Sequence, residues 1–391
     1  MSPATAFRRL NPVERTILTP ELSNASPRAR QGLIGMLQGA GDPVFAAVVE
    51  EARALLRELW RTANPATLIL PGSEEAGLEA VVLNLVEPGD PVLVVVTGDA
   101  GRRIAAAAER AGARVRLVEA PWGEAVGPGA FRDALQRERP RLAAVAHGDP
   151  STGVLQPLPE LAALAHEHGA LLAADLCSTT AVVDVRLDDW GLDACWAGSQ
   201  KGLSAYPGLV LASFGERALT RHRERTVPVA SWERDLAALC APERRYETFP
   251  APLLYALVEV LQLASEQQMA YRVRRHENRR DALVAGLAAL GVEVLVDPDA
   301  RLPSVTIARV PGGVDEHWVR DELREQFRIE IAPGSGPRSE PVWRIGIMSH
   351  SAQPGFIAAL LGLLEALLAE QGHVIPAPGT AVRAAVRVLE R

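Results

Sequence analysis

The sequence predicts an α/β fold, in which a large, mostly parallel sheet with helices on both faces is followed by a smaller α+β domain. In the first 250 residues, short apolar runs without polar alternation are separated by segments of helical length, as in a sheet buried on both faces. After about residue 250 this regular alternation ends. The length of 391 residues also favours two domains, because single cores rarely grow much past about 300 residues.

The elements expected in the large domain alternate along the chain. After a helix around 44–62, we expect strands at 66–72, 90–98, 114–120, 141–149 and 170–178, with helices at 74–86 and 102–112 between the first of them. Ligands of open α/β sheets bind beyond the carboxyl ends of the strands. The sequences at these ends, and in the next apolar stretch, are PGSEE, TGDAG, HGDPSTG, ADLCS and GSQKG.

The expected domain boundaries follow these changes of pattern. We assign an N-terminal arm to 1–22, the large domain to 23–252, the small domain to 253–372 and a C-terminal tail to 373–391. The small domain should begin with one long helix over about 253–290. Strand-like runs follow at 292–298, 304–311, 328–334 and 342–348, with helices at 315–327 and 354–370.

Composition excludes several classes of function. The net charge of -7, with acids and bases mixed along the chain, argues against a nucleic-acid partner. The densest basic run, RVRRHENRR at 272–280, is interpreted as a solvated helix face. Cys177, Cys195 and Cys240 have no zinc or disulfide spacing, and no apolar run is long enough for a membrane span or a signal peptide. We therefore expect a cytoplasmic protein.

A single lysine in a run of small residues is the most informative feature for function. Lys201 lies in WAGSQKGLSAYPG, 26 residues after Asp175, which ends an apolar strand. A lysine desolvated among small side chains should have a lowered pKa and could attack a carbonyl to form a Schiff base. A buried aspartate needs a cationic or hydrogen-bonding partner. Pyridoxal phosphate would meet both needs, because the lysine takes its aldehyde and the aspartate pairs with its ring nitrogen.

The chain resembles the class V aminotransferases of fold-type I pyridoxal phosphate enzymes, especially alanine–glyoxylate and serine–pyruvate aminotransferases. Five segments carry this resemblance in the order and spacing of the family: LEAVVLNLVEPGDPVLVVVTGDAGRR, AHGDPSTGVLQPL, AADLCST, LDACWAGSQKGLSAYPG and VWRIGIMSH. The resemblance covers about residues 20 to 370. It implies that Lys201 is the Schiff-base lysine.

The same resemblance assigns roles to other residues. Asp175 corresponds to the partner of the ring nitrogen and Ser151 to the residue beside the ring hydroxyl. Ser73 and Gln200 correspond to phosphate contacts, and a helix N-terminus after Ser73 suits an anion. Arg344 corresponds to the arginine that binds the substrate α-carboxylate. In the family a Tyr/Thr pair reaches the phosphate from the neighbouring subunit of a homodimer, for which Tyr246 and Thr248 are the candidates.

Two positions depart from the family pattern. Ala100 stands where the family usually has a large side chain stacked on the cofactor ring. Glu74 and Glu75 stand in the phosphate turn, where the family often has a small residue followed by histidine or threonine. Acids favour a first helical turn, but here they would lie near a dianionic phosphate. Either they point away from it, or cofactor affinity is reduced.

Structural roles are alternatives for each candidate. Lys201 could simply pair with an acid, Asp175 and Ser73 could be helix caps, and Arg344 could form a structural ion pair. Turn stabilisation is as good an interpretation as cofactor contact for His147 and Asp149. For Cys177, Trp122 and Trp196 we expect packing or interface roles.

The leading functional hypothesis is an aminotransferase that uses alanine or serine as donor and glyoxylate or pyruvate as acceptor. The alternatives are a non-transaminating pyridoxal phosphate enzyme on the same fold (a lyase, decarboxylase, epimerase or condensation enzyme) and a cofactor-binding regulatory or structural protein. The retained lysine, aspartate and arginine disfavour the last of these. No nucleic acid, membrane or metal partner is expected.

Overall fold

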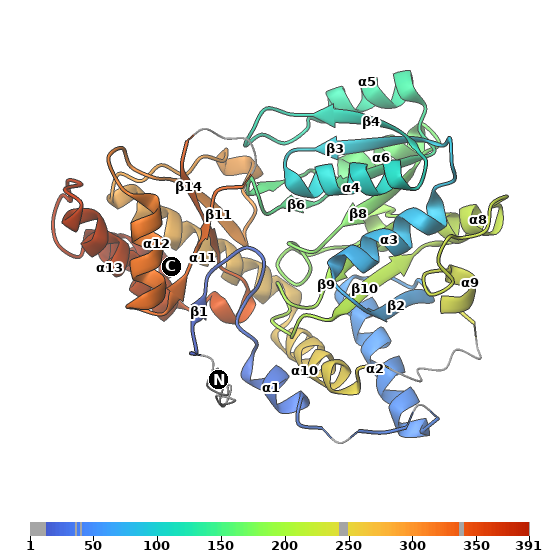
Figure 1. The fold of residues 1–391 in the computed structure, drawn as a ribbon, viewed down its shortest axis with the longest axis horizontal. Helices are drawn as coiled ribbons and strands as arrows, with labels where there is room; N and C mark the ends of the chain where they lie inside the picture. The colour runs from blue at the N-terminus through green and yellow to red at the C-terminus, as the bar shows by residue number, and fades with distance from the viewer. Residues whose placement is uncertain (1–12, 36, 40, 242–248, 336–339, 391) are drawn as a thin grey trace, which may run out of the picture.

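The structure is a computed structural model that describes residues 13–390, apart from 36, 40, 242–248 and 336–339. It has two domains, each with its own core (Figure 1). Within the described residues, no helix is both long enough and apolar enough to cross a membrane.

The large domain is built on a seven-stranded sheet with the order β2-β10-β9-β8-β5-β3-β4. The strands are β2 (Ala66–Pro71), β3 (Pro91–Val96), β4 (Arg114–Glu119), β5 (Leu142–Ala146), β8 (Leu171–Asp175), β9 (Ala194–Gly198) and β10 (Leu209–Phe214). Only β10 runs antiparallel to its neighbours. The mostly parallel sheet predicted from the sequence is confirmed. The antiparallel strand β10 is an addition that the sequence pattern did not reveal.

Both faces of this sheet are covered by helices, which explains why its strands are continuous apolar runs. In β3, Leu93 and Val95 face one core while Val92, Val94 and Val96 face the other. One core includes buried residues of α2 (Pro43–Leu59), α5 (Pro128–Glu138), α6 (Leu158–Glu167) and α10 (Ala251–Gln267). The other includes residues of α3 (Glu74–Leu85), α4 (Asp99–Arg110), α8 (Glu216–Arg223) and α9 (Leu236–Leu239).

The small domain packs helices against a three-stranded antiparallel sheet with the order β11-β14-β13. Its elements are α11 (Met269–Ala289), β11 (Val305–Arg309), α12 (Glu316–Glu325), β12 (Ile329–Glu330), β13 (Ala332–Pro333), β14 (Val342–Gly346), α13 (Pro354–Glu370) and α14 (Thr380–Leu389). The strand expected at 292–298 is reduced to one bridge, between Val294 and Ala308.

The prediction of a single long helix over about 253–290 is wrong. It is two helices, because Gln268 has a left-handed φ of 61° that ends α10 and starts α11 in a new direction. Helix α10 packs on α1 (Pro27–Gly32) and α2, and its apolar residues join the large-domain core. The apolar face of α10 is therefore buried against the large sheet.

The segment expected to be a C-terminal tail at 373–391 contains a packed helix. Helix α14 lies against α11 and α13, and it buries Ala381 and Ala385 in the small-domain core. Its strongly amphipathic pattern, AVRAAVRVL, is that of a helix with one face on a core. The helix is therefore an integral part of the small domain.

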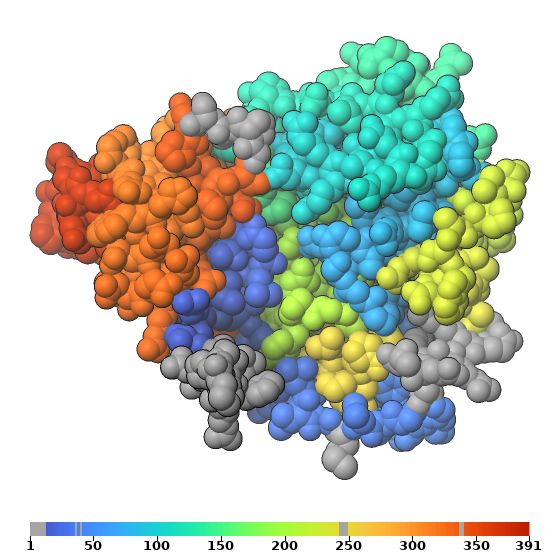
Figure 2. All heavy atoms as spheres, viewed as in Figure 1, coloured from blue at the N-terminus to red at the C-terminus, as the bar shows by residue number. Residues whose placement is uncertain are grey.

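The described part of the N-terminal arm connects the two domains. Strand β1 (Thr16–Ile17) pairs in parallel with β12 of the small domain, and Leu18 is fully buried there. A few residues later, Ser23 contacts the segment around Lys201 in the large domain. Figure 2 shows this blue segment at the junction of the two domains.

Candidate active site

The candidate site lies at one edge of the large sheet. The parallel strands β2, β9, β8, β5 and β3 all end at this edge, so the turns that follow them converge there. The turn after β2 carries Ser73 and Glu74, β8 ends at Asp175, and Gln200 and Lys201 follow β9. The sheet therefore brings together residues that are up to 128 positions apart in the chain, from Ser73 to Lys201.

Lys201 is buried, with 3% of its surface exposed, and its partner is an acid. The Nζ atom lies 2.9 Å from the Oε2 atom of Glu74. Burial lowers the pKa of Lys201, but the negative charge of Glu74, its hydrogen bond and the other acidic groups nearby together raise it by more, so the net shift is upward. The lowered pKa expected from the small neighbouring residues is therefore wrong for this state of the site, because the sequence pattern did not reveal which acid faces the lysine.

Asp175 ends β8 with its carboxylate facing the same charges. Its Oδ1 atom accepts a hydrogen bond from the backbone N–H of Cys177 at 2.8 Å. Burial and then the charge of Glu74 raise the pKa of Asp175, while Lys201 acts in the opposite sense. Two acids thus share one lysine, and the carboxylate of Asp175 would gain from a further cation close to it.

The turn between β2 and α3 treats its two glutamates differently. Glu75 is exposed, whereas Glu74 points inward and also accepts a hydrogen bond from Gln200 Nε2 at 3.3 Å. Arg103 approaches Glu74 from the other side at 3.8 Å. Ser73 is the N-cap residue of α3 but makes no capping hydrogen bond with its side chain. The sequence left open whether these acids point away from the expected phosphate position. Glu75 faces solvent, whereas Glu74 faces the site.

Ser151 and Asp149 cap the helix that carries Ala100. The Asp149 carboxylate accepts hydrogen bonds from the N–H of Ala100 at 3.1 Å and from the N–H of Ser151 at 2.9 Å. The Ser151 hydroxyl accepts from the N–H of Asp99 at 2.9 Å and donates to Asp149. A Cβ atom at Gly98 would overlap both side chains, so this turn requires glycine. Ala100 itself is 2% exposed and packs in the core.

Arg344 extends from the centre of the small-domain sheet toward the large domain. Its guanidinium donates to the carbonyl of Pro333 at 2.7 Å, to Glu21 Oε1 at 2.6 Å and to the carbonyl of Pro150 at 3.4 Å. Pro150 immediately precedes Ser151, so the structure brings Arg344 to the loop that holds Ser151. The expected structural alternative, an ion pair, is also present.

Two supports of the lysine segment escaped the sequence analysis. The Ser23 hydroxyl donates to the carbonyl oxygen of Lys201 at 2.9 Å. Arg272, which is 2% exposed, donates to the carbonyl of Gly202 at 2.9 Å and to that of Ala181 at 3.1 Å. The basic run at 272–280 is thus not wholly a solvated face. Burial lowers the pKa of Arg272 to about 9.

Other candidates have structural positions. His147 is fully enclosed, with its ring edge-on to Trp190 and its Nδ1 atom 3.0 Å from the Thr179 hydroxyl. Burial lowers the pKa of His147 to about 3, so the ring is neutral. Burial also raises the pKa of the Cys177 thiol, and Trp196 lies in the core. Trp122 packs beside a small core cluster between the domains. Tyr246 and Thr248 lie outside the described residues.

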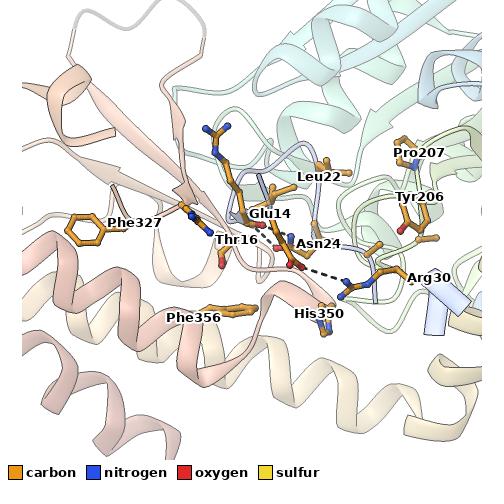
Figure 3. A pocket seen from close by; sticks show the side chains of 16 residues that line it. Glu14, Thr16, Leu22, Asn24, Arg30, Tyr206, Pro207, Phe327, His350 and Phe356 are labelled. Atoms are coloured by element: carbon orange, nitrogen blue, oxygen red, sulfur yellow. Dashed lines mark hydrogen bonds and ion pairs between the residues drawn. The ribbon is translucent and has the colours of Figure 1, made fainter. Parts of the chain in front are cut away.

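A cavity of about 680 Å³ opens next to the lysine segment (Figure 3). Its walls come from the arm, the segment around Tyr206 and the small-domain residues His350 and Phe356. Lys201, Asp175 and Arg344 do not line it. We therefore treat it as a neighbour of the candidate site and not as the site.

Comparison with known proteins agrees with this geometry. The family model of the class-V aminotransferases matches residues 42–357. The chain is 34% identical to the (S)-ureidoglycine–glyoxylate transaminase of Bacillus subtilis over 96% of this chain and 95% of that protein. It is 32% identical to the alanine–glyoxylate aminotransferase of Drosophila melanogaster, over 93% and 94% of the two chains.

Solved structures show the same similarity in three dimensions. The crystal structure of the Bacillus subtilis enzyme superposes with a TM-score of 0.95, covering 98% of this chain and all of that chain. The pyridoxamine–pyruvate aminotransferase of Mesorhizobium loti has a TM-score of 0.89 at 28% identity, covering 97% and 98% of the two chains. The fold class predicted from the sequence is confirmed, and the chain belongs to the class-V aminotransferase family of pyridoxal phosphate-dependent enzymes.

Proposed function

We propose that this aminotransferase moves an amino group from a small amino acid of the alanine or serine type to glyoxylate or pyruvate. The observation that carries the proposal is that the buried Lys201 and Asp175 lie together at the carboxyl ends of the parallel strands, while Arg344 reaches the Ser151 loop from the small domain. The names of the relatives support glyoxylate as acceptor, since both the Bacillus subtilis and the Drosophila melanogaster proteins are named for it.

The donor set at this edge fits the ring half of pyridoxal phosphate. The buried amine of Lys201 would hold its aldehyde, and the partly buried carboxylate of Asp175, which gains from a further cation, would hold its ring nitrogen. At the phosphate end, the first N–H groups of α3 and the uncapped Ser73 are suitable donors. When bound, this cofactor supplies an aldehyde that takes the amino group and a protonated ring that withdraws electrons from the substrate α-carbon.

Each protein residue then has a defined task. Lys201, once its amine is free, can take a proton from the substrate α-carbon and give it to the carbon that was the cofactor's aldehyde carbon. Asp175 holds a proton on the ring nitrogen. Arg344 binds the α-carboxylate with its planar fork and so orients the bond that must break. The Pro150 contact supports this last role, because it puts the guanidinium beside the Ser151 loop.

Reactions other than transamination are less well supported. A cystine C–S lyase resembles this chain with a TM-score of 0.74, but at 17% identity this similarity concerns the fold alone.

A second candidate is a different transamination, in which the amino group of pyridoxamine is transferred to pyruvate, which would leave pyridoxal and alanine. It is favoured by the inward carboxylate of Glu74 in the phosphate turn and by the name of the Mesorhizobium loti relative.

An assay of the purified protein with a panel of donors and acceptors tests the proposal. Alanine, serine and pyridoxamine are offered as donors to glyoxylate and to pyruvate, and both products are quantified. We expect the highest turnover for alanine or serine with glyoxylate or pyruvate, and Lys201→Ala should abolish turnover without unfolding the protein. Borohydride should attach the cofactor covalently to the native chain and not to the variant. Covalent attachment of the cofactor to the variant would contradict the role of Lys201.

We also propose a cytoplasmic homodimer whose two active sites lie at the subunit interface. The family resemblance supports the dimer. It assigns Thr248 to the phosphate site of the partner subunit, and it assigns Tyr246 there as well if a one-residue gap is allowed in the match to the family pattern. Light scattering tests the oligomeric state, and a stable, active monomer would contradict the proposal. Mixing Lys201→Ala chains with Thr248→Ala chains should restore some activity, because part of the hybrid dimers would have one intact site.

A further inference from the structure

Glu74 already occupies the amide of Gln200, one of the two side chains that the resemblance assigns to the phosphate. It is the first residue of α3, directly after Ser73, and only 17% of its side chain is exposed. Its carboxylate contacts Lys201 Nζ at 2.9 Å and Gln200 Nε2 at 3.3 Å, and Arg103 lies at 3.8 Å. The carboxylate of Glu74 therefore lies where the sequence resemblance places the phosphate of the cofactor.

We propose that Glu74 is a selectivity residue, which weakens binding of the 5′-phosphate and leaves the site able to take unphosphorylated pyridoxal or pyridoxamine. The proposal rests on the function proposed above only in that Lys201 and Asp175 hold the ring. It concerns the other end of the cofactor, where the chemical difference is between a phosphate dianion and a neutral hydroxymethyl group.

Charge explains the discrimination. A phosphate ester at the N-terminus of α3 would lie near the carboxylate of Glu74, and two anions in a partly buried site repel each other strongly. The two would also compete for the amide of Gln200. A hydroxymethyl group carries no charge and can donate a hydrogen bond to the carboxylate instead. Glu74 thus penalises one form of the ligand and accepts the other, which is how specificity by repulsion works.

The ion pair also has a consequence for the reactivity of Lys201. Burial raises the pKa of Glu74, but the charge and hydrogen bond of Lys201, the charge of Arg103 and a hydrogen bond from Cys177 together lower it by more, so the carboxylate is ionised at neutral pH. The same pair raises the pKa of Lys201. An ammonium group cannot attack an aldehyde, so Lys201 must lose a proton before it reacts.

The adjacent glutamate provides a matched control. Glu75 has the same charge, the same helix and the next position in the chain, but its side chain is exposed. If net charge near the helix N-terminus were the cause, Glu74→Gln and Glu75→Gln would act alike. If the inward carboxylate is the cause, only Glu74→Gln should change the selectivity.

The test is the ratio of two dissociation constants, for pyridoxal and for pyridoxal phosphate, measured by calorimetry on the native protein, Glu74→Gln and Glu75→Gln. Glu74→Gln should shift this ratio toward the phosphate by about 10-fold or more, whereas Glu75→Gln should change it by less than about 3-fold. Because any change in lysine reactivity affects both ligands, it cancels in the ratio. Glu74→Ala gives a second measurement if Glu74→Gln is poorly folded.

A second readout follows the lysine itself. The rate at which borohydride traps pyridoxal on Lys201 should increase with pH in both proteins. In Glu74→Gln this increase should occur at a lower pH than in the native protein, because a neutral amide does not stabilise the protonated form of Lys201. A shift of about one pH unit or more is expected.

The outcomes separate this inference from the proposed function. Binding of both ligands with an unchanged ratio in Glu74→Gln would overturn the selectivity role and leave the aminotransferase proposal intact. Failure of every variant to bind either ligand would overturn both, since the ring-binding residues would then be wrongly assigned. Equal shifts in Glu74→Gln and Glu75→Gln would replace the specific role with a general effect of charge and so also contradict it.

Discussion

Arg344 of the small domain is joined to Glu21 of the N-terminal arm by a 2.6 Å hydrogen bond between the Nη1 atom and Oε1. The guanidinium side chain is 11% exposed, whereas that of Glu21 is 56% exposed. An exposed acid thus satisfies an almost buried cation, in the position where the proposed function requires a substrate carboxylate. Because an ion pair with so exposed an acid contributes little to stability, a substrate carboxylate could replace Glu21 at little cost.

Glu21→Gln should therefore improve substrate binding. With its internal competitor removed, Arg344 is available to the α-carboxylate, and we expect the KM for the amino donor to fall about 2- to 10-fold, with kcat little changed. Steady-state kinetics with alanine or serine measures this. Arg344→Lys, which loses the planar fork, should raise KM about 10-fold or more. An unchanged KM in both variants would mean that the carboxylate binds elsewhere.

Asp175→Asn should retain the fold and the cofactor but slow turnover at least about 100-fold, because a neutral amide cannot hold a proton on the ring nitrogen. The amide can still accept the hydrogen bond from Cys177 N–H that Asp175 accepts. Cofactor titration and steady-state kcat are the measurements. Asp189→Asn, an exposed acid with a side chain 64% exposed, is the control and should leave kcat unchanged. Native kcat in Asp175→Asn would show that the ring nitrogen is paired elsewhere.

Ala100→Phe tests the departure over the proposed cofactor ring. Ala100 is 2% exposed and packs in the core, so a larger side chain should overpack the site. We expect the free energy of unfolding to fall by about 1–3 kcal/mol and cofactor affinity to fall with it. Ala106→Phe, on the exposed side of the same helix, should change neither. A clear gain in cofactor affinity for Ala100→Phe would contradict this and indicate an uncovered ring.

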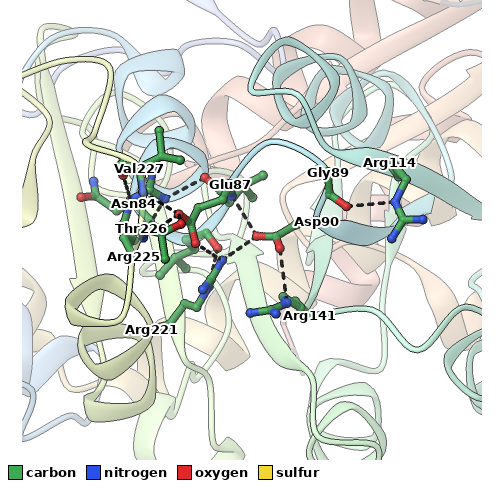
Figure 4. A network of polar contacts seen from close by, with 12 residues as sticks. Asn84, Glu87, Gly89, Asp90, Arg114, Arg141, Arg221, Arg225, Thr226 and Val227 are labelled. Atoms are coloured by element: carbon green, nitrogen blue, oxygen red, sulfur yellow. Dashed lines mark hydrogen bonds and ion pairs between the residues drawn. The ribbon is translucent and has the colours of Figure 1, made fainter.

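The opposite edge of the sheet contains a charge network that serves stability (Figure 4). Arg221 bridges two acids, with Nη2 3.0 Å from Glu87 Oε2 and 2.6 Å from Asp90 Oδ2. All three side chains are 11% exposed. Arg221→Ala should lower the free energy of unfolding by about 3–5 kcal/mol, because it removes the buried cation that the two largely buried carboxylates share.

The control for this network is Arg141→Ala. Arg141 lies 3.3 Å from Asp90 but is 60% exposed, so its loss should cost only about 0–1 kcal/mol. Denaturant unfolding of the two variants measures the difference. Equal effects would contradict the dominant role of burial.

The network also predicts a dependence of stability on pH. Burial opposes ionisation of Glu87, but the hydroxyl and N–H of Thr226, with the N–H of Val227, hold its pKa at about 2. A carboxyl whose pKa is lowered by folding stabilises the protein above its ordinary pKa of 4.5 and loses that contribution as pH falls toward 2. The free energy of unfolding should therefore fall over this range in the native protein, and less steeply in Glu87→Gln.

The sequence predicted the strands well where both faces are buried, because an apolar run such as the one in β3 leaves no other interpretation. It did not predict β10, whose apolar run follows the lysine segment directly, nor the break at Gln268. That break depends on a left-handed residue inside a continuous helical pattern. Local patterns therefore identified elements but not their exact ends.

The candidate site was partly predictable for a similar reason. Strand ends indicated Asp175, and the small residues around Lys201 indicated an unusual lysine. The partner of that lysine was not predictable, since Glu74 reaches it from a strand that is two places away in the sheet. Arg272 was missed because a basic run gives no sign of which one of its members is buried.

The antiparallel strand has a consequence for how the protein is made. Within the described part of the chain, strand β2 pairs with β10 alone, with Leu70 opposite Val210, which follows it by 140 positions in the chain. During synthesis β2 therefore leaves the ribosome long before β10, the strand with which it pairs, exists. Until then it is an apolar strand with open edges, a template for aggregation. Assembly of the Ser73 turn beside Lys201 must then be a late event in folding, with a chain prone to misassociation before it.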